Sequence, residues 1–227
     1  FSHFMTQRAR TLGRHALWET IQATLFAADP AIWGWPAWPR DLQTHGSAAV
    51  RAFERDHADA VQYRFWLQWL AEEQLAQAQR LALGLMPLGL YCDLAVGANE
   101  GGSETWVTRG LYASGAHVGA SPGPLNRMGQ DWGLPPVNPM ALKASRFASF
   151  IELLGCVMRH AGALRIDHVM ALMRLFWSTP EGGTYVNYPL EALLAIVAVE
   201  SHRHHCLVVG EDLGNVPPDM RTAMGQR

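Results

Sequence analysis

This sequence of 227 residues has neither a large excess of positive or negative charge nor any long apolar run. Its 18 basic and 20 acidic side chains leave a formal charge of −2, without the basic excess that is typical of nucleic-acid-binding proteins. Charged residues, glycine or proline interrupt every apolar stretch well before membrane-spanning length, and the N-terminus does not resemble a signal peptide. We therefore expect a globular protein with neither a nucleic-acid nor a membrane partner.

Cysteine is also scarce. The three cysteines, Cys92, Cys156 and Cys206, each lie alone inside an apolar segment. Single cysteines in such segments are typical of buried free thiols, which indicates a reducing, cytoplasmic setting.

Several common enzyme motifs are absent as well. Residues 96–102 match neither the glycine-rich turn that binds dinucleotides nor a P-loop. No cysteine has the local signature of a nucleophile either.

The sequence does contain three short apolar runs, each of which ends at an acidic residue. Runs of this length between glycines and helical segments predict buried parallel strands. The carboxyl ends of such strands carry the chemistry of α/β enzymes, so we expect the three acids to meet at one mouth of a sheet. The runs and their acids are 84–94 with Asp93, 163–167 with Asp167, and 206–210 with Glu211.

The order of predicted elements indicates the fold class. Apolar residues at helical spacing over 1–28 and 57–83 predict a helical subdomain at 1–83. From residue 84 onward, strands alternate with helices, which favours an α/β fold with a parallel sheet and right-handed crossovers. A barrel and a doubly wound sheet fit this pattern equally well. The helices expected after the first strand are 140–160, 193–204 and a last one that begins at Pro217-Pro218.

A long segment rich in glycine and proline, residues 97–139, separates the first of these strands from the next helix. Loops of such length inside a compact domain are usually functional, for example as lids or binding loops. We therefore treat 84–227 as a second domain that carries this segment as an insertion.

Paired carboxylates that flank a pocket suit glycosidic bond cleavage, where one acts as the nucleophile and the other as general acid and then base. Because alternate residues of a strand share a face, Arg165 lies on the same side as Asp167 and would help to keep it ionised. Glu211, at the end of the next strand, suits the acid/base role. These spacings alone are weakly specific, since an acid at a strand end is often a helix cap or a loop salt bridge.

A metal site is the competing interpretation. His202, His204 and His205 lie near the end of a predicted helix, where histidines usually interact with exposed carbonyl groups and the helix dipole. A metal-binding role for the pair Asp167-His168 is as weakly indicated as one for these histidines. We therefore expect no metal ion.

Several motifs, taken together, give the chain a resemblance to a known family. They resemble those of the 4-α-glucanotransferases (amylomaltases or disproportionating enzymes), which form glycoside hydrolase family 77 in the α-amylase clan. The resemblance covers about residues 60–220, and the long bacterial form is the more similar one. The main motifs are LRIDHVM at 164–170, VGEDLGNVP at 209–217 and GQDWGLPP at 129–136, supported by YCDLAVG at 91–97, ETW at 104–106 and YVNYP at 185–189.

This resemblance implies a retaining transglycosylase on a (β/α)₈ barrel. Such an enzyme cleaves an α-1,4 bond of a malto-oligosaccharide and passes the glucan to the 4-hydroxyl of another glucan or of glucose, without a cofactor. It also implies that Asp167 is the nucleophile, that Glu211 is the general acid/base and that Arg165 orients Asp167. The residues implied to contact sugar near the cleaved bond are His168, Asp93, Gln130 and Trp132.

The chain departs from the family pattern in two ways. The family's third acid, the aspartate of a later His-Asp pair, and the first barrel strands have no counterpart, so the resemblance implies an internal fragment that holds roughly strands three to five. Within the insertion, Ser121-Pro122-Gly123 stands where the family usually has Pro-Pro-Asp. Two alternatives stay open: an amylase-like hydrolase of the same clan, and a glucan-binding remnant without catalytic activity.

Overall fold

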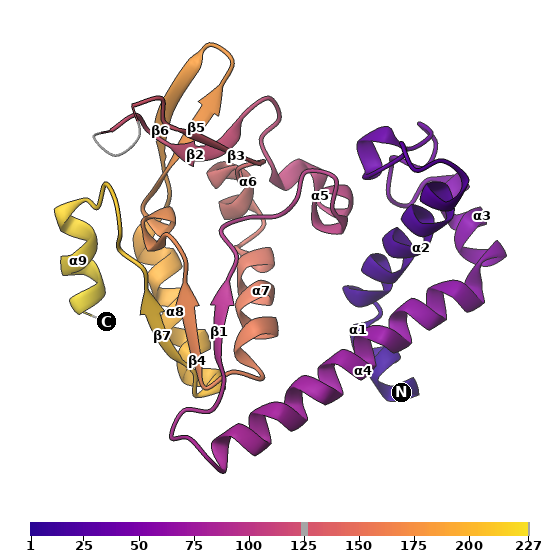
Figure 1. Ribbon diagram of the computed structural model, residues 1–227, viewed down its shortest axis with the longest axis horizontal. Coiled ribbons are helices and arrows are strands. Elements are labelled where there is room, and N and C mark those ends of the chain that lie inside the picture. The colour runs from indigo at the N-terminus through magenta and orange to yellow at the C-terminus, as the bar shows by residue number, and fades with distance from the viewer. Residues whose placement is uncertain (124–126, 227) are drawn as a thin grey trace. The chain divides into compact units, whose positions relative to one another are not determined.

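The computed structural model describes residues 1–123 and 127–226, and their contacts group into two compact units (Figure 1). Unit 1 comprises Phe1–Leu75 and Ala98–Arg109. Unit 2 comprises Ala76–Gly97 and the part of the chain that begins at Gly110. Within the described ranges, none of the helices is both long enough and apolar enough to cross a membrane.

Unit 1 is built from helices. The single helix predicted over 1–28 is divided in two, because residues 9–11 form a turn. Ser47 begins the next helix as an N-cap, since its hydroxyl accepts a hydrogen bond from the Val50 N–H (3.1 Å). The helices are α1 (Ser2–Arg8), α2 (Leu12–Ala28), η1 (Trp35–Ala37), α3 (Ala48–Asp56), α5 (Ser103–Val107) and α4 (Ala58–Leu83), whose last residues belong to unit 2.

An apolar core of its own holds unit 1 together. Its buried members are Leu17, Trp18, Ile21, Trp38, Val50 and Trp106. The indole N–H of Trp106 donates a hydrogen bond to the Leu42 carbonyl (3.1 Å), so the polar edge of this buried ring is satisfied.

Unit 2 contains a parallel sheet of three strands in the order β1-β4-β7 (Figure 1). The strands are β1 (Tyr91–Leu94), β4 (Ala163–Ile166) and β7 (Leu207–Gly210). The second and third agree with the predicted strands to within one residue. The first is much shorter than the predicted 84–94, because Gly89 has a left-handed φ of 71° and the Leu90 N–H bonds to the Gln79 side chain (2.7 Å) rather than to a strand.

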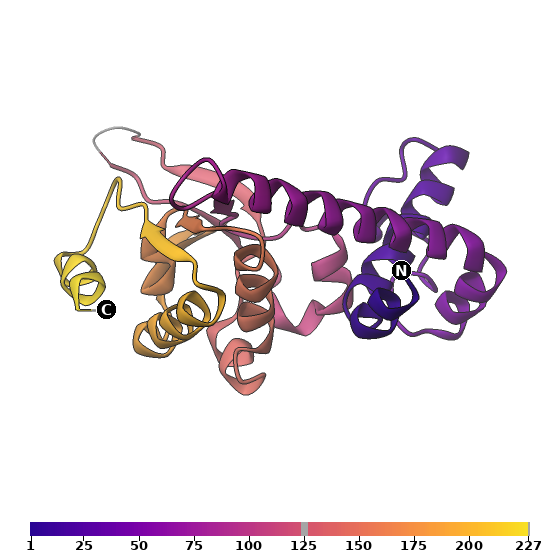
Figure 2. The same cartoon turned by 90° about the horizontal axis from the view of Figure 1, so that it is seen from below.

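Two helices, α7 (Ala148–Met158) and α8 (Leu190–His204), cover one face of this parallel sheet (Figures 1 and 2). The helix predicted over 140–160 is interrupted, since Arg146 and Phe147 adopt left-handed φ values of 54° and 59°. The helices of unit 2 are α6 (Pro139–Ala144), α7 (Ala148–Met158), α8 (Leu190–His204) and α9 (Pro218–Gly225), with η2 (Arg109–Leu111) at its border and η3 (Val169–Leu172) after β4. Residues buried between the sheet and these helices include Leu94, Leu154, Met158, Leu164, Ile166, Leu193, Val197 and Met220.

Strand alternation directs the other side chains to the opposite face of the parallel sheet. Tyr91, Leu207 and Val209 expose 58%, 52% and 42% of their surface, although each belongs to a paired strand. Asp93 and Arg165 have the same parity along their strands, so the predicted site residues lie on the face without helices.

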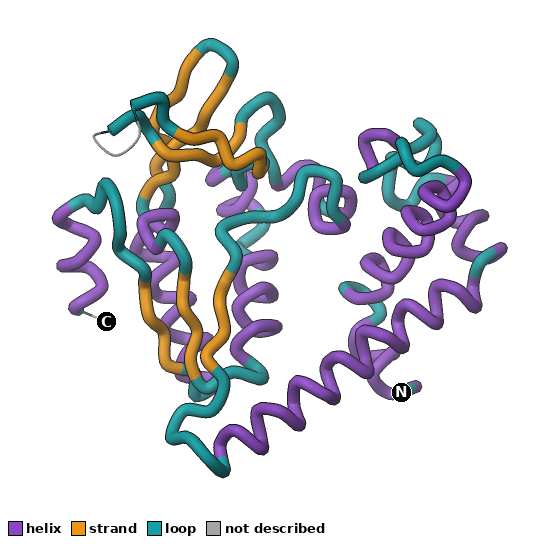
Figure 3. Tube along the Cα trace, in the orientation of Figure 1, coloured by secondary structure: helices purple, strands orange, loops and turns teal. Residues whose placement is uncertain are grey.

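A second sheet, antiparallel and of order β3-β2-β5-β6, forms above the carboxyl ends of the parallel strands (Figures 1 and 3). The insertion predicted as a loop over 97–139 thus contains regular structure; its residues 124–126 lie outside the described part. The segment predicted as a short stretch and a loop around Gly182-Gly183 is instead a hairpin. The strands are β2 (His117–Ala120), β3 (Gln130–Leu134), β5 (Arg174–Thr179) and β6 (Gly182–Asn187).

Candidate active site

The backbone brings Asp167 and Glu211 to matching positions. Ile166 and Gly210 pair at the ends of β4 and β7, so each acid is the first residue beyond its strand. The two segments stay hydrogen-bonded after the strands end, because the Glu211 N–H donates to the Ile166 carbonyl (2.9 Å) and the Val169 N–H to the Glu211 carbonyl (2.9 Å). Both acids therefore lie at the carboxyl ends of neighbouring strands, on backbone that is held by hydrogen bonds.

Arg165 connects Asp167 to the third acid. It pairs with Asp93 across β4 and β1, and its Nη1 lies 3.1 Å from Asp93 Oδ1. Its Nη2 lies 2.7 Å from Asp167 Oδ1. The hydrogen bond to Asp93 raises the pKa of the Arg165 guanidinium further, and the charges of Asp93, Asp167 and Glu211 act in the same direction. The guanidinium thus holds a fixed positive charge among three carboxylates.

Two backbone N–H groups fix the Glu211 carboxylate. The His168 N–H donates to Glu211 Oε2 (2.9 Å), and the Leu213 N–H donates to Oε1 (3.1 Å). The first of these donors directly follows Asp167 in the chain, so the orientation of one acid depends on the backbone next to the other.

His168 occupies a strained position beside both acids. Its φ of 48° is in the left-handed region, which non-glycine residues adopt rarely and often at functional sites. Burial lowers the pKa of His168 below 6.5, although the negative charges of Glu211 and Asp167 partly oppose this. Its imidazole is therefore neutral at pH 7, with one nitrogen able to donate and one able to accept a hydrogen bond.

The strand β3 supplies the remaining predicted residues. The Trp132 ring meets the His168 ring edge to face, with centroids 5.4 Å apart. The Trp132 indole N–H donates to Gln130 Oε1 (3.0 Å), and Gln130 itself is exposed. On the opposite side of this strand, Asp131 pairs with His117 (3.0 Å), and the Gly133 N–H and His117 together lower the pKa of Asp131. The ring contact between Trp132 and His168 thus connects β3 to the segment next to the acids. Gln130 is connected to this segment through Trp132.

Three residues that were not predicted as site residues form a hydrogen-bonded group, which joins the antiparallel sheet to the loop after β7. The Tyr185 hydroxyl lies 2.9 Å from Ser121 Oγ, and the Asn215 amide donates to the same oxygen (3.3 Å). The Arg174 guanidinium stacks 4.2 Å above the Tyr185 ring. Tyr185 and Asn215 both fall inside motifs that carry the family resemblance, and this was the signal that could have identified them.

The histidine-rich end of α8 has a structural explanation. Glu200 is almost fully buried; the Arg203 guanidinium (2.6 Å) compensates its charge, and His204 Nε2 lies 3.4 Å from its other oxygen. His205 ends the helix with a left-handed φ of 52°. Within residues 1–123 and 127–226, no group of three or more His, Cys, Asp or Glu side chains is arranged to hold a metal ion.

All three cysteines are free thiols. Cys206 is buried, and burial raises the pKa of its thiol to about 11. The expectation that each cysteine is buried is only partly met by Cys92, which is half-buried, and it is wrong for Cys156, which is exposed on the side of α7 away from the sheet.

Comparison with known proteins agrees with the resemblance in the motifs. Residues 1–227 match the profile of the 4-alpha-glucanotransferase family. The curated 4-alpha-glucanotransferase of Haemophilus influenzae is 45% identical over 198 residues, which are 85% of this chain and 28% of that protein. The one from Mycobacterium tuberculosis is 41% identical over 226 residues, which are 97% of this chain and 30% of that protein.

Solved structures share the fold. The crystal structure of amylomaltase from Corynebacterium glutamicum has a TM-score of 0.83 at 34% identity, over 100% of this chain and 30% of that one. The amylomaltase of Streptococcus agalactiae in complex with acarbose has a TM-score of 0.84 at 18% identity, over 99% of this chain and 46% of that one. The chain thus spans less than a third of the length of the curated relatives quoted above. It belongs to the 4-alpha-glucanotransferase family, glycoside hydrolase family 77.

Proposed function

We propose that this chain carries the nucleophile and the general acid/base of a retaining 4-α-glucanotransferase that acts on malto-oligosaccharides. The observation that supports this most directly is the group at the carboxyl ends of β4 and β7. There, Arg165 Nη2 lies 2.7 Å from Asp167 Oδ1, and the His168 N–H donates a hydrogen bond to Glu211 Oε2 (2.9 Å). Family membership supplies the substrate class, α-1,4-glucans.

The reaction follows from the two carboxyl groups. In the first half, the Glu211 carboxyl group gives its proton to the glycosidic oxygen while the Asp167 carboxylate attacks the anomeric carbon. The bond between this carbon and the glycosidic oxygen breaks, the fragment on the oxygen side leaves with a new hydroxyl, and the rest of the glucan remains as a covalent glycosyl ester on Asp167. In the second half, the Glu211 carboxylate removes a proton from the 4-hydroxyl of an acceptor sugar, which attacks the same carbon and releases Asp167. Glu211 is thereby protonated again, as it was before the first half.

The neighbouring side chains have supporting roles in this proposal. Arg165 orients the Asp167 oxygen that does not attack. His168, neutral at pH 7, and Asp93 and Gln130 offer hydrogen bonds to sugar hydroxyls, and Trp132 offers an apolar face. The antiparallel sheet above the acids would limit the access of water to the ester, as a transferase requires.

The finer architecture belongs to the same proposal. We assign the parallel strands β1, β4 and β7 to roughly strands three to five of a (β/α)₈ barrel. In this scheme, residues 1–83 form a helical subdomain, and 84–227 form part of the catalytic domain with 97–139 as its insertion. The exposed face of the parallel sheet would then be the inside of the barrel.

The test uses the natural polypeptide that carries this chain, with maltotriose as the substrate. We expect glucose and longer maltodextrins as products, whereas an amylase-like hydrolase would yield glucose and maltose without longer chains. Asp167→Asn and Glu211→Gln should each lower kcat by about 10³-fold or more, on the order of the losses seen when one member of a catalytic unit is removed, with an unchanged circular dichroism spectrum. Near-normal transfer by either variant would remove that residue from the mechanism.

We also propose that residues 1–227 on their own are inactive in transfer. The sheet edges at β1 and β7 and the exposed face between them leave the site open to water, which favours hydrolysis over transfer. The comparison is the isolated chain against a polypeptide of the relatives' length, with mass spectrometry of the peptide that contains Asp167 to detect a covalent glucosyl adduct. Full transferase activity of the isolated chain would contradict this proposal.

A further inference from the structure

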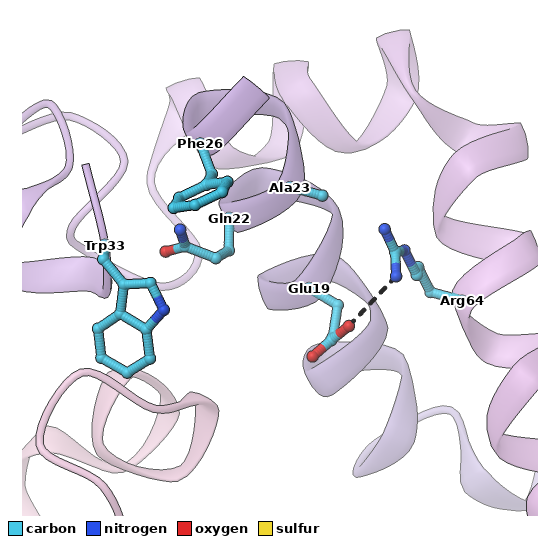
Figure 4. Close-up of a pocket in the computed structure, with 6 residues that line it drawn as sticks. All are labelled: Glu19, Gln22, Ala23, Phe26, Trp33 and Arg64. Carbon is cyan, nitrogen blue, oxygen red and sulfur yellow. Dashed lines mark hydrogen bonds and ion pairs between the residues drawn. The ribbon is translucent and has the colours of Figure 1, made fainter. Parts of the chain in front are cut away.

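Unit 1 exposes two aromatic rings beside a pocket that the proposed reaction does not use. Trp33 and Phe26 expose 55% and 44% of their surface. They line a pocket of about 200 Å³ together with Glu19, Gln22, Ala23 and Arg64 (Figure 4). The α2 helix supplies four of these residues, the loop after it supplies Trp33, and α4 supplies Arg64.

The loop that carries Trp33 is held in place by one buried side chain. The Gln22 amide donates to the Ile32 carbonyl (3.0 Å), and its oxygen accepts from the Gly34 N–H (2.8 Å). The same oxygen accepts from the Trp38 indole N–H (3.0 Å). The backbone is therefore fixed on both sides of Trp33, and a binding ring that is already ordered loses little conformational entropy when a ligand arrives.

Close packing supports the inner edge of the Trp33 ring. The Trp33 ring lies against Gly101, where a Cβ would come within 3.1 Å of the indole, and the backbones of Gly34 and Gly101 are also in close contact. One edge of the indole is thus fixed against the protein while more than half of its surface faces solvent. Together with the Phe26 ring it gives one pocket two exposed aromatic side chains, and contiguous apolar surface of this kind can mark a ligand-binding site.

Two charged side chains, Glu19 and Arg64, line the same pocket as these rings. Glu19 Oε2 and Arg64 Nη1 are 3.4 Å apart, at the long end of a hydrogen bond. A carboxylate offers about four acceptor sites and a guanidinium five N–H donors, so this single contact leaves most of both capacities for a ligand. Because the charges cancel, the pocket has no net attraction for phosphate groups or for a strongly acidic or basic peptide.

We propose that this pocket is a second binding site for glucan chains, separate from the candidate active site. A glucopyranose ring presents an apolar face of C–H bonds, which stacks on an aromatic ring, and a rim of hydroxyls that both donate and accept hydrogen bonds. Trp33 and Phe26 suit the first requirement, and Glu19 with Arg64 suit the second. The assignment of α-glucans among sugars rests on the proposed function, since the geometry itself selects only a sugar ring.

The pocket, at about 200 Å³, is smaller than the roughly 300–1,000 Å³ of drug-sized ligand sites, so it holds only a short part of a glucan chain and its effect depends on chain length. Occupation of a second site by the same polymer raises the effective concentration of that polymer at the first. The site would therefore lower the KM for amylose or glycogen. It would leave the kinetics with maltotriose unchanged, because one maltotriose molecule is too short to occupy this pocket and the candidate active site at the same time.

The experiment measures binding without turnover. The natural polypeptide that carries this chain is prepared with Asp167→Asn, so that glucan is not consumed, and its affinity for soluble amylose and for glycogen is measured by affinity electrophoresis. Trp33→Ala and Phe26→Ala should each weaken this affinity about tenfold, the usual scale for loss of an aromatic anchor. Trp33→Phe, which keeps a ring, and Glu19→Gln, which keeps the side-chain shape, should weaken it less.

Tyr63→Ala is the matched control, because Tyr63 is an equally exposed aromatic residue (55%) of unit 1 that does not line the pocket. Wild-type affinity of both alanine variants at the pocket, with unchanged circular dichroism, would overturn the site, and so would an equal loss in Tyr63→Ala. If Trp33→Ala does not fold, Phe26→Ala and Glu19→Gln decide the question. Because no variant depends on turnover, a failure of the proposed reaction leaves this result interpretable.

Discussion

Arg165 reaches carboxylates from two different segments, and only a planar, forked cation can do so from one position. Lysine would place a single ammonium group between Asp93 and Asp167 and could not hold both in fixed geometry. If Asp167 is the nucleophile as proposed, we expect Arg165→Lys to lower kcat by about 10²-fold with a smaller change in KM, since the loss would concern the orientation of Asp167 rather than sugar binding.

The melting temperature distinguishes this role from a structural one. Arg165 and its partners are partly exposed, and ion pairs of this kind contribute little to stability. The Arg165→Lys variant should therefore melt close to the wild type. Unchanged kcat, or a large loss of melting temperature that parallels the loss of activity, would contradict the orienting role.

His168 connects the site to pH. Burial lowers its folded-state pKa below 6.5, so the unfolded chain binds a proton more readily than the folded one. Stability contributed by the neutral ring is therefore complete above about pH 6.5 and is lost as the pH falls below that value. We expect the urea midpoint to decrease between about pH 7 and pH 5, and His168→Asn to make that decrease shallower.

Asparagine is the suitable replacement because it tolerates the left-handed backbone that His168 adopts. Some pH dependence should remain, because burial and Arg14 also lower the pKa of His45. Urea titrations of both proteins at three pH values are the measurement. An identical pH dependence in the variant would show that His168 is not the group that titrates.

Strands and helices that are stabilised locally could be predicted from the sequence. The parallel strands β4 and β7 are short apolar runs that end in acids, and α4 and α8 have apolar residues at helical spacing, so a single sequence is sufficient for each. The antiparallel sheet could not be predicted this way. Its strands β2 and β5 pair residues that are about 60 positions apart, such as His117 with Ser178, and buried residues do not alternate with exposed ones along either strand.

The site shows the same division. Asp93, Asp167 and Glu211 follow from strand ends and register, which depend on local patterns. The contact of Trp132 with His168 and the hydrogen bond of Trp132 to Gln130 depend on where β3 lies, and only the family resemblance suggested these two residues. The link between Ser121 and Tyr185 was missed because it joins the residue after β2 to β6, and the pairing of these strands could not be deduced.

The start of β4 offers a test of the parallel sheet as an element. Gly162 precedes this strand; its N–H donates to the Leu90 carbonyl (2.9 Å), and its carbonyl accepts from the Leu207 N–H (3.0 Å). A Cβ at this position would overlap the Leu88 carbonyl oxygen. Since the obstacle is backbone on a paired segment, Gly162→Ala should lower the free energy of unfolding by about 2 kcal/mol or more.

Gly110→Ala is the control, because a Cβ there meets nothing within 4 Å and its backbone needs no left-handed φ. That variant should stay within about 0.5 kcal/mol of the wild type. Urea denaturation followed by circular dichroism compares the two. Equal stability of both variants would mean that Leu88 can move away from β4 at little cost.

At the scale of the whole molecule, the two units have separate hydrophobic cores, and the sequence gives each its own spectroscopic reporter. Trp132 and Trp177 lie in unit 2, and the other seven of the nine tryptophans lie in unit 1. All three cysteines lie in unit 2, and Cys206 is buried there. Tryptophan fluorescence therefore reports mainly on unit 1, and thiol labelling of Cys206 reports on unit 2.

We expect the two units to unfold in separate transitions, which these reporters can distinguish. Val50→Ala removes buried atoms from the core of unit 1, so it should lower the urea midpoint of fluorescence and leave that of Cys206 labelling unchanged. Leu164→Ala, in the core of unit 2, should do the reverse. Each should cost its own unit on the order of 1–4 kcal/mol, with the leucine variant at the upper end. If either substitution moved both midpoints equally, the chain would unfold as one cooperative body, and the separate cores would not confer separate stability.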